Sequence, residues 1–358
     1  MNVIFQAQVP KAHGQDAQVS ARGILEPIVS VCIPTYNRAA MLKNAMDSVL
    51  AQTFGDFELI VSDNASSDGT EALVRSYRDE RIRYVKHERN MGAVSNFNRC
   101  MAMSRGRYVT VVNDDDVMLA ENLLLKVQSL NEHPNVGFVY SGYELVDASL
   151  RPVPCHPNFI QAATRDAVER GHDFLEHSLL FGCHVAMSSV VIRRDCIERI
   201  GGFNESLDYA SDYDYWMRLS FLYDVMVLAV PLVQYRIHPT NDTGKFTTML
   251  NGRLVPNQIG LEEVFRTKLA MITHAQAVLP AHTRILEAVR EKSTGQLAHL
   301  IERQLLAYQL NREARAYLLR MWKRYPALLE FRTIVKLLLK TYAAKHLFFL
   351  FERVKYSQ

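Results

Sequence analysis

Three consecutive carboxylates, Asp114, Asp115 and Asp116, follow the apolar run 108–112. Crowded carboxylates repel one another, and each is costly to remove from water unless a cation compensates its charge. Oxygen ligands select a hard ion such as Mg²⁺ or Mn²⁺, which often also contacts the phosphates of a substrate. The alternative is a solvated acidic turn that caps the next helix. The triplet alone therefore indicates either a divalent metal site or an acidic turn.

The elements that must position these carboxylates alternate between strand and helix patterns. Apolar runs predict strands at 28–33, 57–61, 81–86 and 108–112, and the intervening segments predict helices at 38–52, 69–77 and 93–103. This alternation is typical of a parallel sheet with helices on both faces, and such sheets bind ligands at the carboxyl ends of their strands. The polar clusters 35–37, 63–64 and 113–116 fall at these ends. We therefore expect them to meet at one edge of the sheet.

The chain divides into three regions by pattern. Residues 1–26 are polar with scattered Gly and Pro, and predict a flexible extension. The pattern over residues 27–245 predicts the α/β domain, with a first half over 27–130 and a second half over 131–245. In the second half we expect strands at 136–140, 188–192 and 225–236 and helices at 195–200 and 212–223. Ser211 or Asp212 is the expected N-cap of the last helix. Residues 246–358 predict a helical appendage.

Composition limits the kind of partner. The formal net charge of +3 over 358 residues is small and argues against a dedicated nucleic-acid binder. From Asn241 onward the chain has 19 Lys and Arg against 9 Asp and Glu, so the part before it is acidic, which fits a cationic ligand there. Five irregularly spaced cysteines indicate a reducing compartment. With neither a signal-like start nor a run of about 20 apolar residues, we expect a cytoplasmic protein.

The last segment, 311–358, combines basic residues with aromatic and aliphatic ones. One interpretation is an amphipathic helix that contacts the inner face of a membrane peripherally through anionic lipids. The other is a helix that packs on the protein core and exposes a basic face to solvent. The sequence leaves both open.

Several motifs occur in a specific order. They are Val31–Arg38 (VCIPTYNR), Ile60–Thr70 (IVSDNASSDGT), Asn90–Gly92 with Asn98, Asn113–Asp116, Gly201–Glu205 (GGFNE), Ser211–Leu219 (SDYDYWMRL) and Tyr235–His238 (YRIH). In this order and spacing the chain resembles the family 2 glycosyltransferases over about residues 29–243. The resemblance implies the GT-A fold, a Rossmann-like and mostly parallel sheet with helices on both faces. It also implies transfer of a sugar, with inversion, from a nucleotide-diphosphate donor assisted by Mn²⁺ or Mg²⁺.

The resemblance also implies roles for individual residues. It assigns the nucleotide sugar to Pro34, Thr35, Tyr36, Arg38, Asp63, Asn90, Asn98 and Asp114, and the metal to Asp115 and His238. A turn-forming role for Asp63 and a structural role for His238 are the alternatives at those positions, and Asp68 is expected mainly to cap a helix. Arg236 could pair with phosphate or lie at the surface. The family's D-x-D pattern has Asn113 at its first position here, which leaves open how many carboxylates contact the ion.

A second carboxylate pair, Asp212 and Asp214, matches the position of the catalytic base in the family. An ionised Asp can take the proton of an acceptor hydroxyl as its oxygen attacks the anomeric carbon. Asp212 fits by its place in the motif, and Asp214 is the alternative. The acceptor is expected to be a glycan or a lipid-linked sugar, in bacterial surface polysaccharide or lipopolysaccharide assembly. A nucleotidyltransferase of similar fold and a non-catalytic nucleotide-sugar-binding protein are the competing functions.

Overall fold

The computed structural model describes residues 26–153, 163–181, 185–238, 240–241, 247–250, 253–256 and 267. The first half consists of β1 (Val29–Thr35), α1 (Ala39–Leu50), β2 (Phe57–Asp63), α2 (Thr70–Ser76), β3 (Ile82–Lys86), α3 (Ala93–Ala102), β4 (Tyr108–Val111), β5 (Val117–Met118) and α4 (Asn122–Glu132). The second half consists of β6 (Val136–Val146), β7 (Ala167–Glu169), α5 (Gly171–Phe181), the short 3₁₀ helix η2 (Met187–Ser189), β8 (Val190–Arg193), α6 (Arg194–Ile200), α7 (Ser211–Ser220) and β9 (Asp224–Arg236). A separate pair follows, β10 (Thr247–Leu250) and β11 (Arg253–Pro256).

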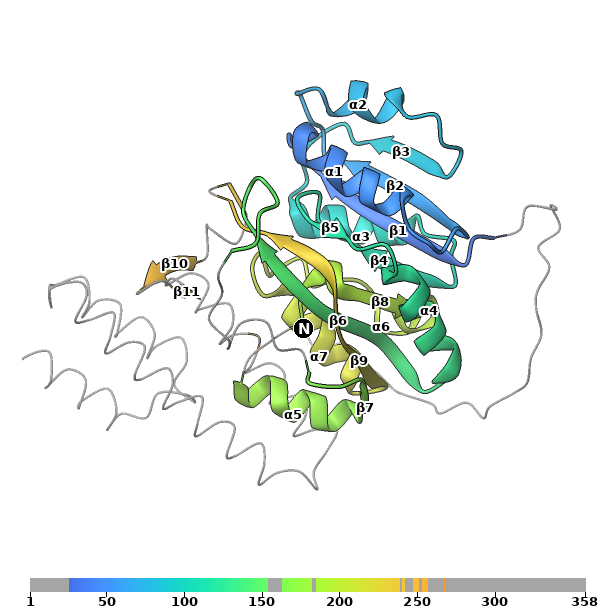
Figure 1. Ribbon diagram of the computed structural model, residues 1–358, viewed down its shortest axis with the longest axis vertical. Helices are drawn as coiled ribbons and strands as arrows, with labels where there is room; N and C mark the ends of the chain where they lie inside the picture. The colour runs from blue at the N-terminus through green and yellow to red at the C-terminus, as the bar shows by residue number, and fades with distance from the viewer. Residues whose placement is uncertain are drawn as a thin grey trace, which may run out of the picture.

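One large mixed sheet runs through the domain in the order β3-β2-β1-β4-β8-β6-β9-β5, with β7 also paired to β9 (Figure 1). The strands β1, β2, β3, β4, β6 and β9 share one direction, and β5, β7 and β8 run in the opposite one. The expectation of a mostly parallel sheet with helices on both faces is therefore confirmed. Two of the reversed strands, β7 and β8, belong to the second half and β5 to the end of the first half, and no sequence pattern predicted their direction.

Each face of the sheet has its own apolar core, because successive strand residues point to opposite sides. Val29, Val31 and Ile33 of β1 pack with the buried residues of α1 and α4. Cys32, between them in sequence, packs on the other face with α3, α6 and α7. A strand buried on both faces is apolar throughout, which explains the continuous apolar runs in the sequence.

The loops after β1 and β2 are tied to each other by side chains. Asn37, in the left-handed region at φ 52°, donates its backbone N–H to Ser66 Oγ at 2.9 Å and accepts from the Ser67 N–H at 2.8 Å. Asp68 accepts from the backbone N–H of Thr70 at 3.0 Å and of Ala39 at 3.1 Å. Asp68 thus satisfies N–H groups at the starts of both α1 and α2, which confirms its predicted capping role.

Several predicted elements differ from the observed ones. Helix α7 begins at Ser211 and its N-cap residue is Ala210, so neither Ser211 nor Asp212 is at the N-cap position, although the Asp212 carboxylate accepts the Tyr213 backbone N–H in the first turn. Strand β6 runs to Val146, past the predicted end at Tyr140, and β5, β7 and α5 were not predicted. The region predicted as helical from residue 246 begins instead with the antiparallel pair β10–β11. The extension 1–25 and almost all residues after 256 lie outside the described residues, so the predictions for them are not addressed.

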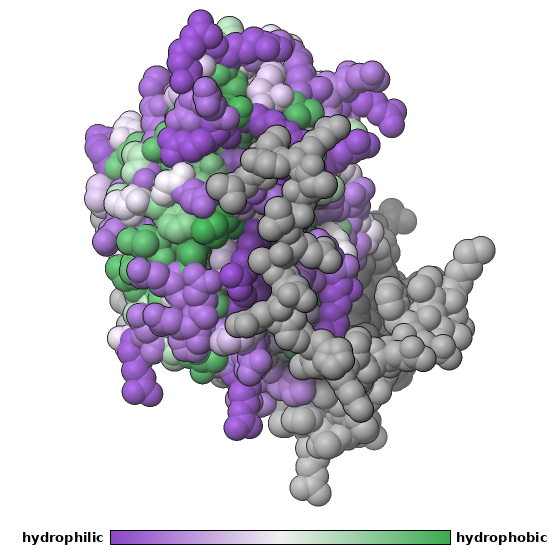
Figure 2. Space-filling view, turned by 90° about the vertical axis from the view of Figure 1, so that its right-hand side faces the viewer, coloured by the Kyte–Doolittle hydropathy of each residue, from purple (hydrophilic) through white to green (hydrophobic). Residues whose placement is uncertain are grey.

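Figure 2 shows the side of the molecule that faces right in Figure 1. The described surface in this view is mostly hydrophilic, with apolar side chains gathered in a smaller area. Within the described residues, no helix combines the length and apolar character that a membrane span requires.

Candidate active site at the carboxyl edge of the sheet

The polar clusters predicted to meet at one edge of the sheet do meet there. Thr35 ends β1 and pairs with Asp63, the last residue of β2, and the acidic residues follow β4 on the other side of β1. Thr35 Oγ1 donates to Asp114 Oδ2 at 2.7 Å. The parallel register of β1 with both neighbours therefore brings together residues far apart in the sequence.

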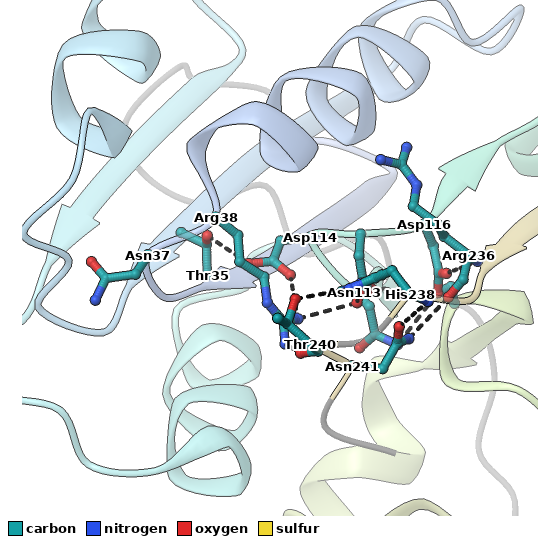
Figure 3. Close-up of polar contacts among 12 residues, drawn as sticks. Thr35, Asn37, Arg38, Asn113, Asp114, Asp116, Arg236, His238, Thr240 and Asn241 are labelled. Atoms are coloured by element: carbon teal, nitrogen blue, oxygen red, sulfur yellow. Dashed lines mark hydrogen bonds and ion pairs between the residues drawn. The ribbon is translucent and has the colours of Figure 1, made fainter. Parts of the chain in front are cut away.

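Arg38 contacts the first two carboxylates of the acidic motif, and Figure 3 shows its side chain beside Asp114 and Thr240. Its Nη1 donates to Asp114 Oδ1 and to Asp115 Oδ2, each at 3.1 Å, and its Nη2 donates to the carbonyl oxygen of Thr240 at 2.8 Å. The two carboxylate side chains are only 5% and 7% exposed, against 20% for Arg38. The protein thus supplies an internal cation where two buried negative charges would otherwise repel each other.

His238 approaches the same carboxylate from the segment after β9. Its Nε2 lies 3.0 Å from Asp115 Oδ2 and its Nδ1 lies 2.9 Å from Thr240 Oγ1. Asn241 holds this segment in place, since its Oδ1 accepts from the His238 backbone N–H at 2.5 Å and its Nδ2 donates to the Arg236 carbonyl at 2.9 Å. The imidazole is 1% exposed. Its orientation toward Asp115 is therefore built in by two hydrogen-bonded neighbours.

Asp116 connects three segments of the chain. Its Oδ1 accepts from the Arg236 backbone N–H at 3.0 Å, and its Oδ2 accepts from Ser188 Oγ at 2.5 Å and from Asn113 Nδ2 at 3.3 Å. The Asn113 backbone N–H in turn donates to Ser188 Oγ at 3.0 Å. Asp116 and Asn113 thus join the ends of β4 and β9 to η2, which leaves Asp114 and Asp115 as the carboxylates of the motif that face the rest of the site.

The environment separates the proton affinities of these carboxylates. Burial, together with the adjacent charge of Asp115, raises the pKa of Asp114 to about 6, although hydrogen bonds from Thr35 and the charge of Arg38 oppose the shift. Burial and the charge of Asp115 also raise the pKa of Asp116 to about 8, although hydrogen bonds from Ser188, Asn113 and the Arg236 backbone oppose the shift. Asp114 is therefore mostly ionised at neutral pH, whereas Asp116 holds a proton much of the time.

The second predicted carboxylate pair divides into two clearly different groups. Asp214 is buried and accepts from Arg218 Nε at 2.7 Å, so its charge is paired within the helix. Asp212 accepts from the backbone N–H of Tyr213 at 2.7 Å, and no cationic side chain pairs with it among the described residues. Loss of hydration raises the pKa of Asp212 to about 6. Asp212 is therefore the better proton acceptor of the pair.

The topology places Asp212 on the carboxyl-edge side of the domain. Helix α3 follows β3 and so begins at this edge, and Ser95 in its first turn donates to Glu205 of the loop that leads into α7. Helix α7 runs directly into β9, whose first residue, Asp224, pairs with Val136 at the opposite edge. A helix of ten residues is about 15 Å long. The start of α7, which contains Asp212, therefore lies toward the carboxyl edge and its end toward the amino edge.

The remaining predicted nucleotide-sugar residues lie around this edge, and they differ in how exposed they are and in how far the protein already bonds their polar groups. Pro34 lies within β1, and Tyr36 is 44% exposed just beyond it. The buried carboxylate of Asp63 is already satisfied by the Ser66 N–H at 2.7 Å and the Tyr84 hydroxyl at 2.5 Å. Asn90 is exposed and lines a hollow of about 410 Å³.

Asn98 is bound within the protein. Its amide makes hydrogen bonds to both backbone groups of Phe203, at 2.7 and 3.0 Å, and to Glu205 at 2.9 Å. Gly202 is required beside it, since a Cβ there would lie 2.3 Å from Asn98 Oδ1. The geometry gives Asn98 a role in holding the Gly201–Glu205 loop, and its predicted contact with the nucleotide stays a prediction.

The donor set at Asp115 and His238 fits a cation shared with a substrate. Across the described part of the chain, no cluster of three or more His, Cys, Asp and Glu side chains could hold a metal ion by itself. Mg²⁺ and similar ions commonly take only one or two protein ligands and complete their shell with phosphate oxygens and water. Asp115 and His238 would be those ligands, with Arg38 giving up its place at Asp115.

Four residues of this network were not predicted. Ser188 was assigned to a strand, and Tyr84, Thr240 and Asn241 carried no role. Asn241 follows His238 by three residues, a spacing at which Asn side chains often bond to the local backbone, so that signal was present in the sequence. Ser188 offered no such signal, because its contact depends on how η2 packs against the end of β4.

Comparison with known proteins agrees with this fold and indicates the family. The family described as glycosyl transferase family 2 matches residues 30–188. An uncharacterized glycosyltransferase of Rickettsia prowazekii is 33% identical over 224 residues, which cover 62% of this chain and 68% of that protein. An Escherichia coli protein named UDP-Glc:alpha-D-GlcNAc-diphosphoundecaprenol beta-1,3-glucosyltransferase WfgD is 26% identical, over 57% of this chain and 73% of that one.

The fold has a solved counterpart. The crystal structure of S. aureus TarS 1–349 in complex with UDP-GlcNAc superimposes with a TM-score of 0.60 at 18% identity, covering 85% of this chain and 82% of that one. The fold and site thus define a glycosyltransferase of the GT-A type. The chain belongs to family 2 of the glycosyltransferases, as the sequence motifs implied.

Proposed function

We propose that this enzyme transfers a sugar from a nucleotide-diphosphate donor to an acceptor hydroxyl with inversion at the anomeric carbon. The observation that carries the proposal is the arrangement around Asp115. One carboxylate oxygen there faces both a fixed imidazole and an arginine, while a separate carboxylate, Asp212, is paired with no cationic side chain among the described residues. A direct displacement needs two such groups of residues. The donor station, Asp115 with His238 and Arg38, would receive the leaving diphosphate, and the acceptor station, Asp212, would receive the proton of the acceptor.

At the donor station, Asp115 and His238 would hold the cation, and the cation would supply positive charge to neutralise the departing diphosphate. Thr35 orients Asp114 for a hydrogen bond to the donor, and Arg38, once released from Asp115, is within reach of the phosphates because it is anchored at the start of α1. Tyr36, exposed at the end of β1, offers an aromatic face on which a nucleotide base can stack. These roles follow the family motifs and agree with the positions of the residues.

At the acceptor station, Asp212 receives the proton of the attacking hydroxyl. Its pKa of about 6 leaves it ionised at neutral pH and more basic than an ordinary aspartate, which favours proton transfer. Asp214 is already paired with Arg218 and stabilises the first turns of α7. The same carboxylate would not serve both stations, since the nucleophile must attack from the side opposite the leaving group.

The named relative WfgD supports a UDP-hexose as the first donor class to test and a diphosphate-linked lipid sugar as the first acceptor class. Such an acceptor agrees with a role in surface polysaccharide or lipopolysaccharide assembly. The test is release of nucleoside diphosphate by the purified protein with Mn²⁺, across UDP-, GDP- and dTDP-sugars. Asp115→Asn should lose metal-dependent donor binding, whereas Asp212→Asn should keep donor binding and lose transfer. Transfer at the wild-type rate in both variants would refute the assigned roles.

A further inference from the structure

A groove of about 540 Å³ lies between α3 and α6, outside the acidic cluster of the candidate site. Both helices pack on the same face of the sheet. Charged and polar side chains line part of the groove, among them Arg194 at the start of α6. Its apolar lining comes from Met101, Ala102, Ile197 and Phe203. A groove with apolar walls and a charged rim suits a short peptide segment that carries aliphatic side chains.

One end of the groove lies at the amino edge of the sheet. Tyr108, the first residue of β4, pairs at this edge with Val29 of β1 and with Arg193, the last residue of β8. Helix α3 leads into β4 and α6 follows β8 directly, so the end of α3 and the start of α6 both lie there. Since Ser104 and Arg194 line the groove, this end of it lies close to the start of β1.

The chain enters the domain at this same end. The Glu26 carboxylate lies 3.8 Å from the guanidinium of Arg194. Both side chains are partly exposed, so the ion pair contributes little to stability. Its value is positional, because it places the residue that precedes β1 beside a residue that lines the groove. Residues immediately before Glu26 therefore need to travel only a few ångströms to enter the groove.

The sequence just before this point provides a suitable occupant. Residues 1–25 lie outside the described part of the chain. Within them, Ile24 and Leu25 are the only two adjacent aliphatic residues between Phe5 and β1. The seven-residue α6 is about 10 Å long, and an extended chain covers about 3.3 Å per residue, so residues 23–25 match the length of this helix. Burial of aliphatic side chains is favourable because it removes apolar surface from water.

We propose that the groove between α3 and α6 is the docking site for residues 23–25 of the same chain. The covalent link at Glu26 favours this occupant over a separate molecule, because a short tether gives an effective concentration in about the millimolar range. The docked segment covers Gly202 and Phe203, which belong to the loop that Asn98 holds from the other helix. The inference does not depend on which reaction the enzyme performs.

The first test is photo-cross-linking of the full chain. Ile24 and Leu25 are replaced, one at a time, by p-benzoylphenylalanine, because successive side chains of an extended segment point to opposite sides. At least one of the two proteins should form a cross-link within a single chain to Met101, Ala102 or Ile197, identified by peptide mapping. The same replacement at Phe5 is the matched control and should give no cross-link to these three residues.

The other outcomes of this test overturn the proposal. A cross-link that occurs only between two chains would show that a second copy occupies the groove. Cross-links from both positions to other surfaces, or none at all, would show that residues 23–25 do not dock there.

The second test is thermal unfolding. Ile24→Ser/Leu25→Ser should lower the melting temperature by on the order of 3–6 °C, whereas the control Ile4→Ser/Phe5→Ser should not. Ala102→Lys changes an exposed position that lines the groove and should also lower the melting temperature, because it blocks docking.

The two lesions should not add when they are combined, since each removes the same contact. An unchanged melting temperature in Ile24→Ser/Leu25→Ser, or fully additive losses in the combined variant, would contradict the proposal. If a variant fails to fold, the cross-links still decide the question, because they are measured in chains that keep the groove intact.

Discussion

Replacement of Arg38 by methionine should increase the affinity of the metal-free, nucleotide-free protein for Mn²⁺. Arg38 Nη1 lies 3.1 Å from both Asp114 Oδ1 and Asp115 Oδ2, so a cation that binds Asp115 must displace it. A hydrogen bond to a charged group contributes about 1.5–3 kcal/mol. Since about 1.4 kcal/mol is a tenfold change in affinity, loss of this competitor should tighten Mn²⁺ binding by about 10- to 100-fold.

The measurement is titration of free Mn²⁺ by electron paramagnetic resonance. Arg75→Met is the matched control, because Arg75 is 67% exposed on α2 and pairs with Glu71 away from the site. In a chelating buffer, Arg38→Met should also unfold at a lower temperature than wild type, since two buried carboxylates lose their counter-ion. Mn²⁺ binding that is no tighter in Arg38→Met than in wild type would refute the idea that Arg38 occupies the cation's place.

Three further outcomes follow from the geometry. Sugar transfer by the wild type should fall as the pH drops through about 6, where Asp212 becomes protonated. Asp212→Asn should transfer sugar more slowly by about 10²- to 10⁴-fold and should lack that pH dependence. A pH profile of Asp212→Asn that matches wild type would show that Asp212 is not the base. Asp116→Ala should destabilise the fold by about 2–4 kcal/mol in urea unfolding, because the Arg236 N–H and the Ser188 hydroxyl lose their acceptor, whereas Asp116→Asn should cost less. The raised pKa of Asp116 means that its ionisation is disfavoured in the fold, so wild type should lose stability relative to Asp116→Asn as the pH rises toward about 8. Asn98→Ala should lower stability by about 1–3 kcal/mol and leave UDP affinity unchanged, since its amide bonds only the 203–205 loop; a large loss of affinity would restore the nucleotide contact.

The first half of the domain is predictable from sequence because local pattern and tertiary structure agree there. Strands β1, β2 and β4 are buried on both faces and each connecting helix follows the 3.6-residue period, so the pattern over 29–111 predicts nearly the observed elements. The second half mixes strand directions. The two-residue β5 and the reversal of β8 depend on pairing with β9 and β4, which no local pattern encodes.

The site shows the same division. Residues that end strands, such as Thr35 and Asp114, could be placed because a parallel sheet gathers strand ends at one edge. What the sequence could not provide is which groups neutralise one another. The pairing of Arg38 with Asp115, the use of Asp116 as a connection between strands and the burial of Arg236, for which the sequence had left a surface position open, all depend on side-chain directions in the assembled edge.

The most direct measurement is a crystal structure of the protein with Mn²⁺ and UDP, in which the anomalous scattering of manganese locates the ion. The account predicts one strong peak at coordination distance from Asp115 and His238 Nε2, with diphosphate oxygens in the same shell, Arg38 turned away from Asp115, and Asp212 across the donor site from the diphosphate. A manganese peak bound elsewhere on the chain, or diphosphate bound with Arg38 still between Asp114 and Asp115, would contradict it.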